Sequence, residues 1–164
     1  MTEEEKKRLF LAVGFIVVSW GILESNCSLI TNALYLNENL SKLLPGKPKR
    51  MPKFLDRQFA FQRQCLFVKD GPLTSCKQPL VELITRTEKH KDIREMLAHS
   101  ALLEQSSSGT IYRFNNLDAK EIDHLATEWE LDLSTFARYR ENLGELVNEW
   151  SLMARKAIPL VEAF

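Results

Sequence analysis

The sequence has no excess of charge of either sign. Its 164 residues include 22 lysines and arginines and 22 aspartates and glutamates. Because a net charge near zero gives no long-range attraction for phosphate groups, any contact with nucleic acid has to come from a local basic patch. The chain length is typical of one domain with a buried core, and we expect residues 1–164 to form a single domain.

Cysteine and histidine are scarce, and neither is clustered. The three cysteines are Cys27, Cys65 and Cys76, and no two of them have the spacing of a Cys-x-x-Cys pair. This argues against a disulfide framework and against a zinc knuckle. The three histidines are also too dispersed for a metal cluster. We therefore predict no metal and no cofactor, and a reducing cytoplasm as the location of the protein.

Long hydrophobic runs are scarce too. The run from Leu9 to Leu23 is apolar apart from Ser19, but it is shorter than the roughly 20 residues that a membrane-spanning helix needs. Three glutamates precede it at positions 3–5, whereas a signal peptide begins with a positively charged segment. We expect this run to be a buried helix and predict no contact with a membrane.

Proline is absent before Pro45, which allows one long N-terminal helix. Thr2 and Glu5 have the spacing of a capping box, and the helix is expected to run from residue 2 to residue 36. Alternating steps of three and four residues predict a stripe that faces a partner helix. Its members are Phe10, Val13, Val17, Trp20, Glu24, Cys27, Thr31 and Leu34. Glu24 is its one carboxylate, either at a bundle edge or facing a partner group.

The rest of the chain is also rich in helix signals. Further helices are predicted at 52–68, at 79–97 with a kink near His90, at 118–130, and at 134–158 before Pro159. Two short runs at 101–105 and 110–114 flank Ser-Ser-Ser-Gly and predict a small β-hairpin. The sequence therefore predicts an all-α, up-and-down helical bundle of four to five helices with one small β-hairpin insertion.

A basic loop separates the first two predicted helices. Three prolines and a glycine between residues 44 and 52 cannot continue a helix. The loop cations Lys47, Lys49, Arg50 and Lys53 could contact RNA phosphates without reading bases. The alternative is a solvated, flexible connector.

One pair of residues suggests chemistry. Arg94 and His99 lie five positions apart near the end of a predicted helix, directly before the hairpin. His99 can transfer a proton near neutral pH, and Arg94 can bind two phosphate oxygens. The spacing alone is weak, because five residues place two side chains about 140° apart around a helix. The alternative is a surface cation and a histidine that caps a helix C-terminus.

The wider pattern resembles the HEPN family of RNA-cleaving helical bundles. The resemblance rests on the arginine, four residues and a histidine, with Leu-Ala before the histidine and a small residue after it. A first helix with Trp20 and Glu24 one turn apart, the hairpin and a long closing helix add to it. One position departs from the family pattern: Glu95 follows the arginine, where active members most often have Asn, Asp or His.

The resemblance implies a metal-independent endoribonuclease of the toxin or antiviral kind. In such an enzyme the RNA 2′-hydroxyl attacks its own phosphate at a composite site between two subunits. Arg94 and His99 would be catalytic, with Glu24 and Glu95 as supporting residues. The implied partners are a second copy of the chain, an RNA substrate and a separate antitoxin protein. The alternatives are a non-catalytic HEPN-like module that binds RNA, a nucleotide or a protein partner, which Glu95 favours, and a dimerisation module without a ligand.

Overall fold

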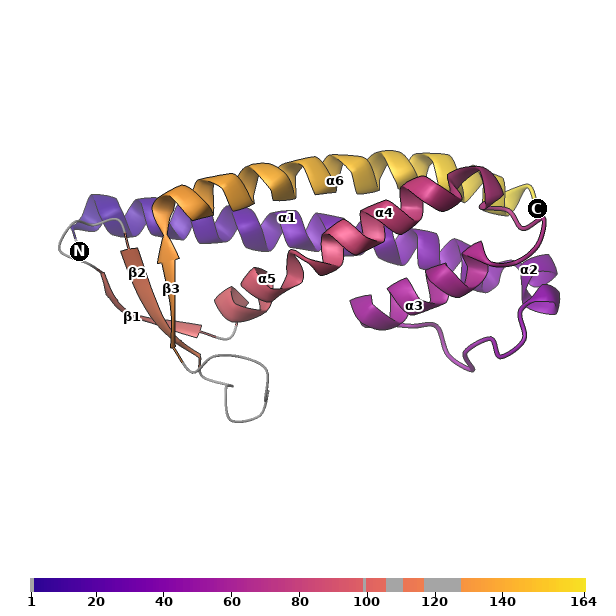
Figure 1. Ribbon diagram of the computed structural model, residues 1–164, viewed down its shortest axis with the longest axis horizontal. Helices are drawn as coiled ribbons and strands as arrows, with labels where there is room; N and C mark the ends of the chain where they lie inside the picture. Colours follow the sequence, from indigo (N-terminus) through magenta and orange to yellow (C-terminus); the bar gives the residue numbers. More distant parts are fainter. Residues whose placement is uncertain (1, 99, 106–110, 117–127) are drawn as a thin grey trace. The chain divides into compact units, whose positions relative to one another are not determined.

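The computed structural model describes residues 2–98, 100–105, 111–116 and 128–164. The predicted all-α bundle with a small β insertion is confirmed (Figure 1). The helices are α1 (Glu3–Leu36), α2 (Glu38–Leu43), α3 (Leu55–Leu66), the 3-10 turn η1 (Thr74–Cys76), α4 (Lys77–Glu88), α5 (Lys91–Ala98) and α6 (Leu133–Glu162). The strands are β1 (Ser100–Gln105), β2 (Ile111–Asn116) and β3 (Glu128–Asp132).

The chain divides into two compact units. The first comprises Met1–Trp20 and Lys89–Glu145, and the second comprises Gly21–Glu88 and Leu146–Phe164. The long helices α1 and α6 each contribute one segment to both units. The two units are therefore described one after the other, and the single domain expected from the sequence stays a prediction.

The start of α1 follows the sequence prediction. The backbone N–H of Thr2 donates to the Glu5 carboxylate at 2.6 Å, and the backbone N–H of Glu5 donates to the Thr2 hydroxyl at 3.3 Å. These two bonds form the predicted capping box and satisfy N–H groups that a helix start leaves open. They also hold the pKa of the Glu5 carboxyl below its usual value.

The buried stripe of α1 differs from the predicted one in its first half. Phe10 and Val17 are 71% and 57% exposed, so the prediction that they face the core is wrong. The buried apolar residues of α1 are Leu9, Ile16, Trp20, Leu23, Cys27, Ile30 and Leu34, and Thr31 of the predicted stripe is buried as well. Between residues 9 and 18 every residue except Gly14 is a large or small apolar one. Spacing therefore cannot separate two adjacent stripes there, and packing decides between them.

The apolar N-terminal run of α1 is buried on one side only. Its most apolar 18-residue window is 28% buried, and its length and composition would allow it to cross a membrane. Leu11 and Val18 are 65% and 63% exposed. The prediction of a buried helix therefore describes one face of α1 and not the other.

The first unit contains a three-stranded antiparallel sheet in the order β1-β2-β3. The strands β1 and β2 form the predicted hairpin, with Ser100 paired to Asn116. The third strand was not predicted: β3 pairs with β2 and begins at Glu128, inside the helix expected at 118–130. The alternation of polar and apolar residues in Glu-Trp-Glu-Leu-Asp fits a strand better than a helix. The rest of that expected helix, 117–127, lies outside the described residues.

The second unit packs its helices around two stacked rings. The rings of Phe59 on α3 and Trp150 on α6 lie 5.7 Å apart between centroids and are nearly parallel. Trp150 Nε1 donates to the Thr87 hydroxyl of α4 at 2.8 Å. The amide of Gln62 donates to the Cys27 carbonyl and to the Thr31 hydroxyl of α1. Each buried polar side chain in this set thus meets a partner on another helix.

Two helix boundaries in the second unit correct the sequence prediction. A short helix, α2, begins directly after α1, because the Asn37 side chain accepts a hydrogen bond from the backbone N–H of Leu40 at 2.7 Å. The helix α6 continues through Pro159 to Glu162. A proline removes only its own N–H bond and strains one turn, and the turn that follows is anchored, since Asn37 Nδ2 donates to the Val161 carbonyl at 2.7 Å.

The predicted helix at 79–97 forms as two helices. α4 ends at Glu88 and α5 begins at Lys91, so the kink expected near His90 is a complete break. The helix predicted at 52–68 begins only at Leu55, after the last loop proline. His90 therefore stands directly before α5, and Lys53 lies in the loop that precedes α3.

Candidate functional site

Arg94 lies in the middle of α5, in the first unit. Its Nη1 donates to the Glu95 carboxylate at 3.0 Å, and the two side chains are 33% and 38% exposed. The structure therefore brings together the predicted catalytic arginine and one of its two predicted supporting residues. A half-buried guanidinium paired with a carboxylate keeps a defined orientation and still reaches solvent.

His99 lies outside the described residues. Its neighbours in the chain are Ala98, the last residue of α5, and Ser100, the first residue of β1. Arg94 thus lies near the end of a helix, and the β insertion begins directly after position 99, as the sequence predicted. The role of His99 stays a prediction.

A relay of buried side chains fixes the start of α5. Trp20 Nε1 on α1 donates to the Tyr139 hydroxyl of α6 at 2.8 Å, and this hydroxyl donates to the His90 carbonyl at 2.8 Å. The His90 and Tyr139 rings also stack, with centroids 5.8 Å apart. Because His90 directly precedes α5, this relay positions the helix that carries Arg94.

The electrostatics of Tyr139 link the relay to Arg94. Burial raises the pKa of the Tyr139 hydroxyl to about 12. The Trp20 hydrogen bond and the positive charge of Arg94 act in the opposite direction. The hydroxyl therefore keeps its proton at neutral pH and can donate it to His90. No spacing pattern predicts this contact, because Tyr139 is 49 residues from His90 and 119 residues from Trp20.

Glu24, the other predicted supporting residue, belongs to the second unit. Its side chain is half-buried on α1, one turn before Cys27. Burial raises the pKa of the Cys27 thiol, and the Glu24 carboxylate adds to this rise. Arg94 belongs to the first unit, so the expected contact between Glu24 and the motif stays a prediction.

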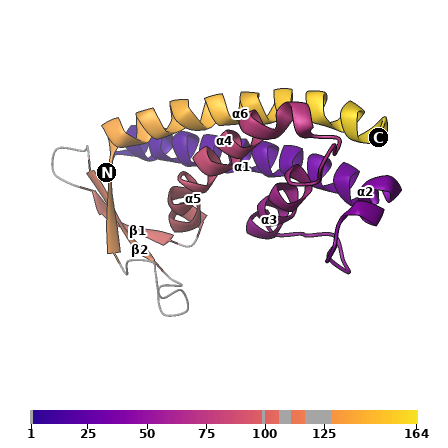
Figure 2. The ribbon, with the colours of Figure 1, turned by 45° about the vertical axis from the view of Figure 1, so that its right-hand side comes forward.

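The basic loop of the second unit connects α2 to α3 (Figure 2), and side chains fix it at several points. Lys47 Nζ donates to the Tyr35 carbonyl at 2.5 Å and to the Ser41 hydroxyl at 2.6 Å, and it lies 4.3 Å from the centre of the Tyr35 ring. The Tyr35 hydroxyl in turn donates to the Lys49 carbonyl at 3.1 Å. Lys47, predicted to contact RNA, therefore uses its ammonium group to support the loop.

Two glutamines of α3 hold the same loop from the other side. Gln64 Nε2 donates to the Pro45 carbonyl at 2.9 Å. Gln58 Nε2 donates to the Lys53 carbonyl at 3.2 Å, and the Gln58 side chain is buried. Side chains from α1 and α3 thus hold loop carbonyls at both ends.

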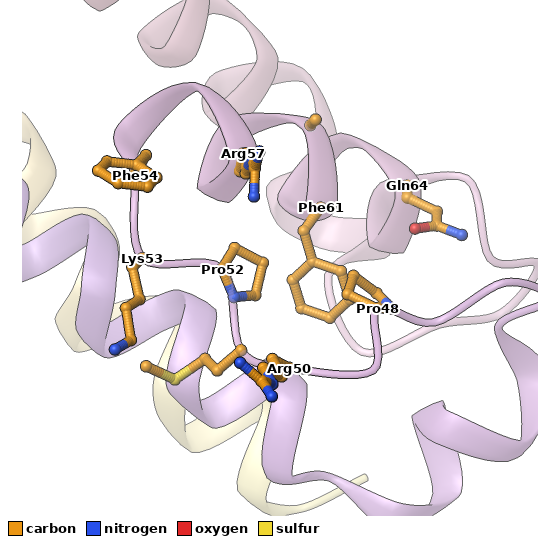
Figure 3. Close-up of a pocket in the computed structure, with 10 residues that line it drawn as sticks. Pro48, Arg50, Pro52, Lys53, Phe54, Arg57, Phe61 and Gln64 are labelled. Atoms are coloured by element: carbon orange, nitrogen blue, oxygen red, sulfur yellow. The ribbon is translucent and has the colours of Figure 1, made fainter.

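A cavity of about 490 Å³ lies between this loop and α3 (Figure 3). Two of the predicted RNA-binding residues, Arg50 and Lys53, line it, together with Arg57 of α3. In Figure 3, Arg57 and Arg50 lie on opposite sides of the Pro52 ring. Arg57 was not among the predicted site residues, although it stands within the run of cations between residues 42 and 63.

Comparisons with known proteins add no relative. No family model matches the chain, and no curated protein and no solved structure matches it. The resemblance to the HEPN family therefore rests on the motif, the helical pattern and the β insertion alone. What this resemblance implies about function is a proposal.

Proposed function

We propose that the protein is a metal-independent endoribonuclease of the HEPN type, with Arg94 and His99 as its catalytic residues. The observation that carries this proposal is the placement of Arg94 on α5. The start of that helix is fixed by the Trp20–Tyr139–His90 relay, and its end leads to His99 and the β insertion. A rigid support of this kind is what a catalytic side chain needs, because small displacements of reacting groups lower the rate.

The proposed reaction needs only the RNA and these two side chains. The 2′-oxygen loses its proton and forms a bond to the adjacent phosphorus, while the bond from phosphorus to the 5′-oxygen of the next nucleotide breaks. His99 takes the proton of the 2′-hydroxyl, and the departing 5′-oxygen takes up a proton from an imidazolium of His99 in the composite site. Such proton transfer contributes about 10² to 10⁴-fold. Arg94 stabilises the negative charge that grows on the phosphate oxygens. The products are a 2′,3′-cyclic phosphate and a 5′-hydroxyl.

A homodimer is part of the proposal. The family resemblance implies a composite site, in which two copies of the chain bring their arginine and histidine residues to one phosphate. The exposed side of α1 supports such a dimer, because its apolar residues recur at steps of three, four or seven. They are Leu11, Phe15, Val18, Ile22, Leu29 and Leu36. Large exposed apolar patches mark interaction surfaces.

Light scattering across dilutions tests the dimer. We expect twice the chain mass, and a variant with serine at Leu11 and Val18 should shift the equilibrium toward the monomer. A monomer at all concentrations, or binding of the wild-type protein to lipid vesicles through this face, would contradict the dimer. A separate antitoxin remains a proposal that rests on the family resemblance, and a cytoplasmic location remains one that rests on the number and spacing of the cysteines.

A non-catalytic RNA-binding module is the second candidate. The ion pair between Arg94 and Glu95 favours it, because the carboxylate competes with a phosphate for the guanidinium. In that case the protein would bind RNA with the same residues and leave it intact.

Incubation of the full chain with single-stranded RNA in EDTA separates the two candidates. We expect cleavage with 2′,3′-cyclic phosphate ends, and no cleavage of DNA of the same sequence. Activity that disappears only with EDTA would contradict the proposed mechanism, and binding without any cleavage would favour the second candidate.

A further inference from the structure

The cavity between the basic loop and α3 is a second site that the proposed cleavage does not use. Its volume of about 490 Å³ lies within the range of small-molecule sites, roughly 300–1,000 Å³. It is built entirely from the second unit, whereas Arg94 belongs to the first. Its ligand can therefore be inferred from its own walls.

The inner wall of the cavity is apolar and partly aromatic. Phe61 is buried and contacts the cavity beside Pro48 and Pro52, and Figure 3 shows its ring turned toward Pro48. Phe54 lines the same cavity and is 71% exposed. An exposed phenylalanine and flat proline rings form a surface on which a planar ring can stack.

The rim of the cavity is cationic. Arg50, Lys53 and Arg57 contribute three positive charges from the loop and from the first turns of α3. The Arg57 guanidinium lies 5.9 Å from the centre of the Phe54 ring, so a charge and an aromatic face are presented together. Guanidinium groups bind phosphate with two parallel hydrogen bonds, and the ligand is therefore expected to carry a phosphate.

The start of α3 presents both backbone N–H groups and one carboxylate, that of Asp56 in its first turn. Within the described residues, Phe54 precedes the helix without a side-chain hydrogen bond to its first turn. The first N–H groups of a helix carry partial positive charge and bind anions when no side chain caps them. The Asp56 carboxylate offsets this attraction, so the inference rests on the cationic rim and the aromatic wall.

The walls are set in place by the fold. Gln58 holds the Pro52 and Lys53 carbonyls, Gln64 holds Pro45, and Tyr35 holds Lys49. A ligand that enters such a cavity does not have to order the loop first, which lowers the entropic cost of binding.

We propose that this cavity binds a single nucleotide. Its base packs against Phe54 and the apolar wall, and its phosphate lies between Arg50, Lys53 and Arg57. The same chemistry is offered by a free nucleoside monophosphate and by one unpaired nucleotide of an RNA chain. The proposal does not depend on Arg94, on His99 or on cleavage.

Calorimetric titration of the full chain tests the site. The probes are AMP, adenosine, inorganic phosphate and a short unpaired oligoribonucleotide. We expect AMP or the oligoribonucleotide to bind more tightly than adenosine or inorganic phosphate. Adenosine supplies only the base contacts, and inorganic phosphate supplies only the phosphate contacts. His99→Ala protein is used with the oligoribonucleotide so that cleavage does not change the titrant.

Two variants and their matched controls locate the binding. Phe54→Ala should weaken binding by about 5- to 150-fold, the range expected for one stacked base. Arg57→Gln should weaken binding and reduce its dependence on salt. Phe67 is 72% exposed with Lys77 Nζ 4.5 Å from its ring centre, outside the cavity. Phe67→Ala and Lys77→Gln should leave the affinity unchanged.

The outcomes separate this site from the proposed nuclease. If the oligoribonucleotide binds, AMP does not, and Phe54→Ala abolishes the binding, the site is supported and RNA is identified as the source of the nucleotide. If both probes bind, a free nucleotide is supported as well. Binding of neither probe, equal affinity for AMP and adenosine, or an equal effect of Phe54→Ala and Phe67→Ala would overturn it. A protein that binds AMP through this cavity without cutting RNA would contradict the proposed nuclease and leave the nucleotide site standing.

Discussion

The two units present their cations in different ways. In the first unit, Arg94 is half-buried, paired with Glu95, and carried by a helix whose start is fixed by buried aromatic side chains. In the second unit, the side chains of Arg50, Lys53 and Arg57 are exposed around a cavity with an apolar wall. The first arrangement suits a group that must be oriented for a reaction. The second suits a group that holds a ligand, and substitutions should therefore affect rate in one unit and affinity in the other.

The largest expected effect is on the rate. His99→Ala should lower kcat for RNA cleavage by about 10² to 10⁴-fold, as for other lost proton-transfer groups. Arg94→Lys should also lower kcat, because an ammonium group cannot bind two phosphate oxygens in one plane. KM should change little in both variants. Single-turnover kinetics in EDTA measure both values, with Arg138→Lys, an exposed arginine of α6 in the same unit, as the control.

The relay should matter for stability as well as for activity. Tyr139→Phe leaves the buried Trp20 N–H without its acceptor and the His90 carbonyl without its donor. We expect the free energy of unfolding to fall by about 1–3 kcal/mol, with a lower kcat. Tyr35→Phe removes one hydroxyl contact in the second unit and should cost about 0.5–1.5 kcal/mol. Denaturant unfolding measures both losses. Equal losses of unfolding free energy in Tyr139→Phe and Tyr35→Phe would show that the relay stabilises its unit no more than one loop contact does.

Alkaline pH should weaken the first unit through the same hydroxyl. The pKa of Tyr139 is raised to about 12 in the folded protein, against about 10 in an unfolded chain. A raised pKa contributes stability below the unfolded value, and this contribution is lost as pH rises toward the folded value. Between pH 10 and pH 12 the wild type should therefore lose about 2 kcal/mol more than Tyr139→Phe. If the free energies of unfolding of the two proteins fall equally between pH 10 and pH 12, the contribution of the Tyr139 hydroxyl is contradicted.

The smallest expected effect concerns the residue that departs from the family pattern. Glu95→Gln keeps the size of the side chain and removes its charge. Because partly exposed ion pairs contribute only about 0.2–1 kcal/mol, kcat should change by about fivefold or less. A loss as large as that of His99→Ala would give Glu95 a direct part in the reaction.

The parts of the fold that were predictable depend on short-range chemistry. The capping box of Thr2 and Glu5, the hairpin of β1 and β2, and the proline-rich loop are each specified by residues close in sequence. The buried stripe of α1 was not predictable between residues 9 and 18, because nearly all of them are apolar. β3 was missed because the helix predicted at 118–130 was extended over its first residues, although their polar and apolar alternation favours the strand that pairs with β2.

The candidate sites show the same division. Arg94 and its pairing with Glu95 follow from adjacency in the sequence. The contribution of Tyr139 depends on contacts across more than a hundred residues, and the cavity depends on Gln58 and Gln64 holding a loop that precedes them. No local pattern encodes either, so the charged residues of the loop were visible in the sequence while the shape of their site was not.

The central claim, that the RNA supplies its own nucleophile at a site formed by Arg94 and His99, can be tested on one substrate. A position at which the wild-type protein cuts an RNA oligonucleotide in EDTA is mapped, and the nucleotide on its 5′ side is replaced by its 2′-deoxy form. We predict that cleavage stops at that position and continues at other positions of the same oligonucleotide. Continued cleavage at the 2′-deoxy position would show that another nucleophile attacks the phosphate, and would contradict the proposed mechanism.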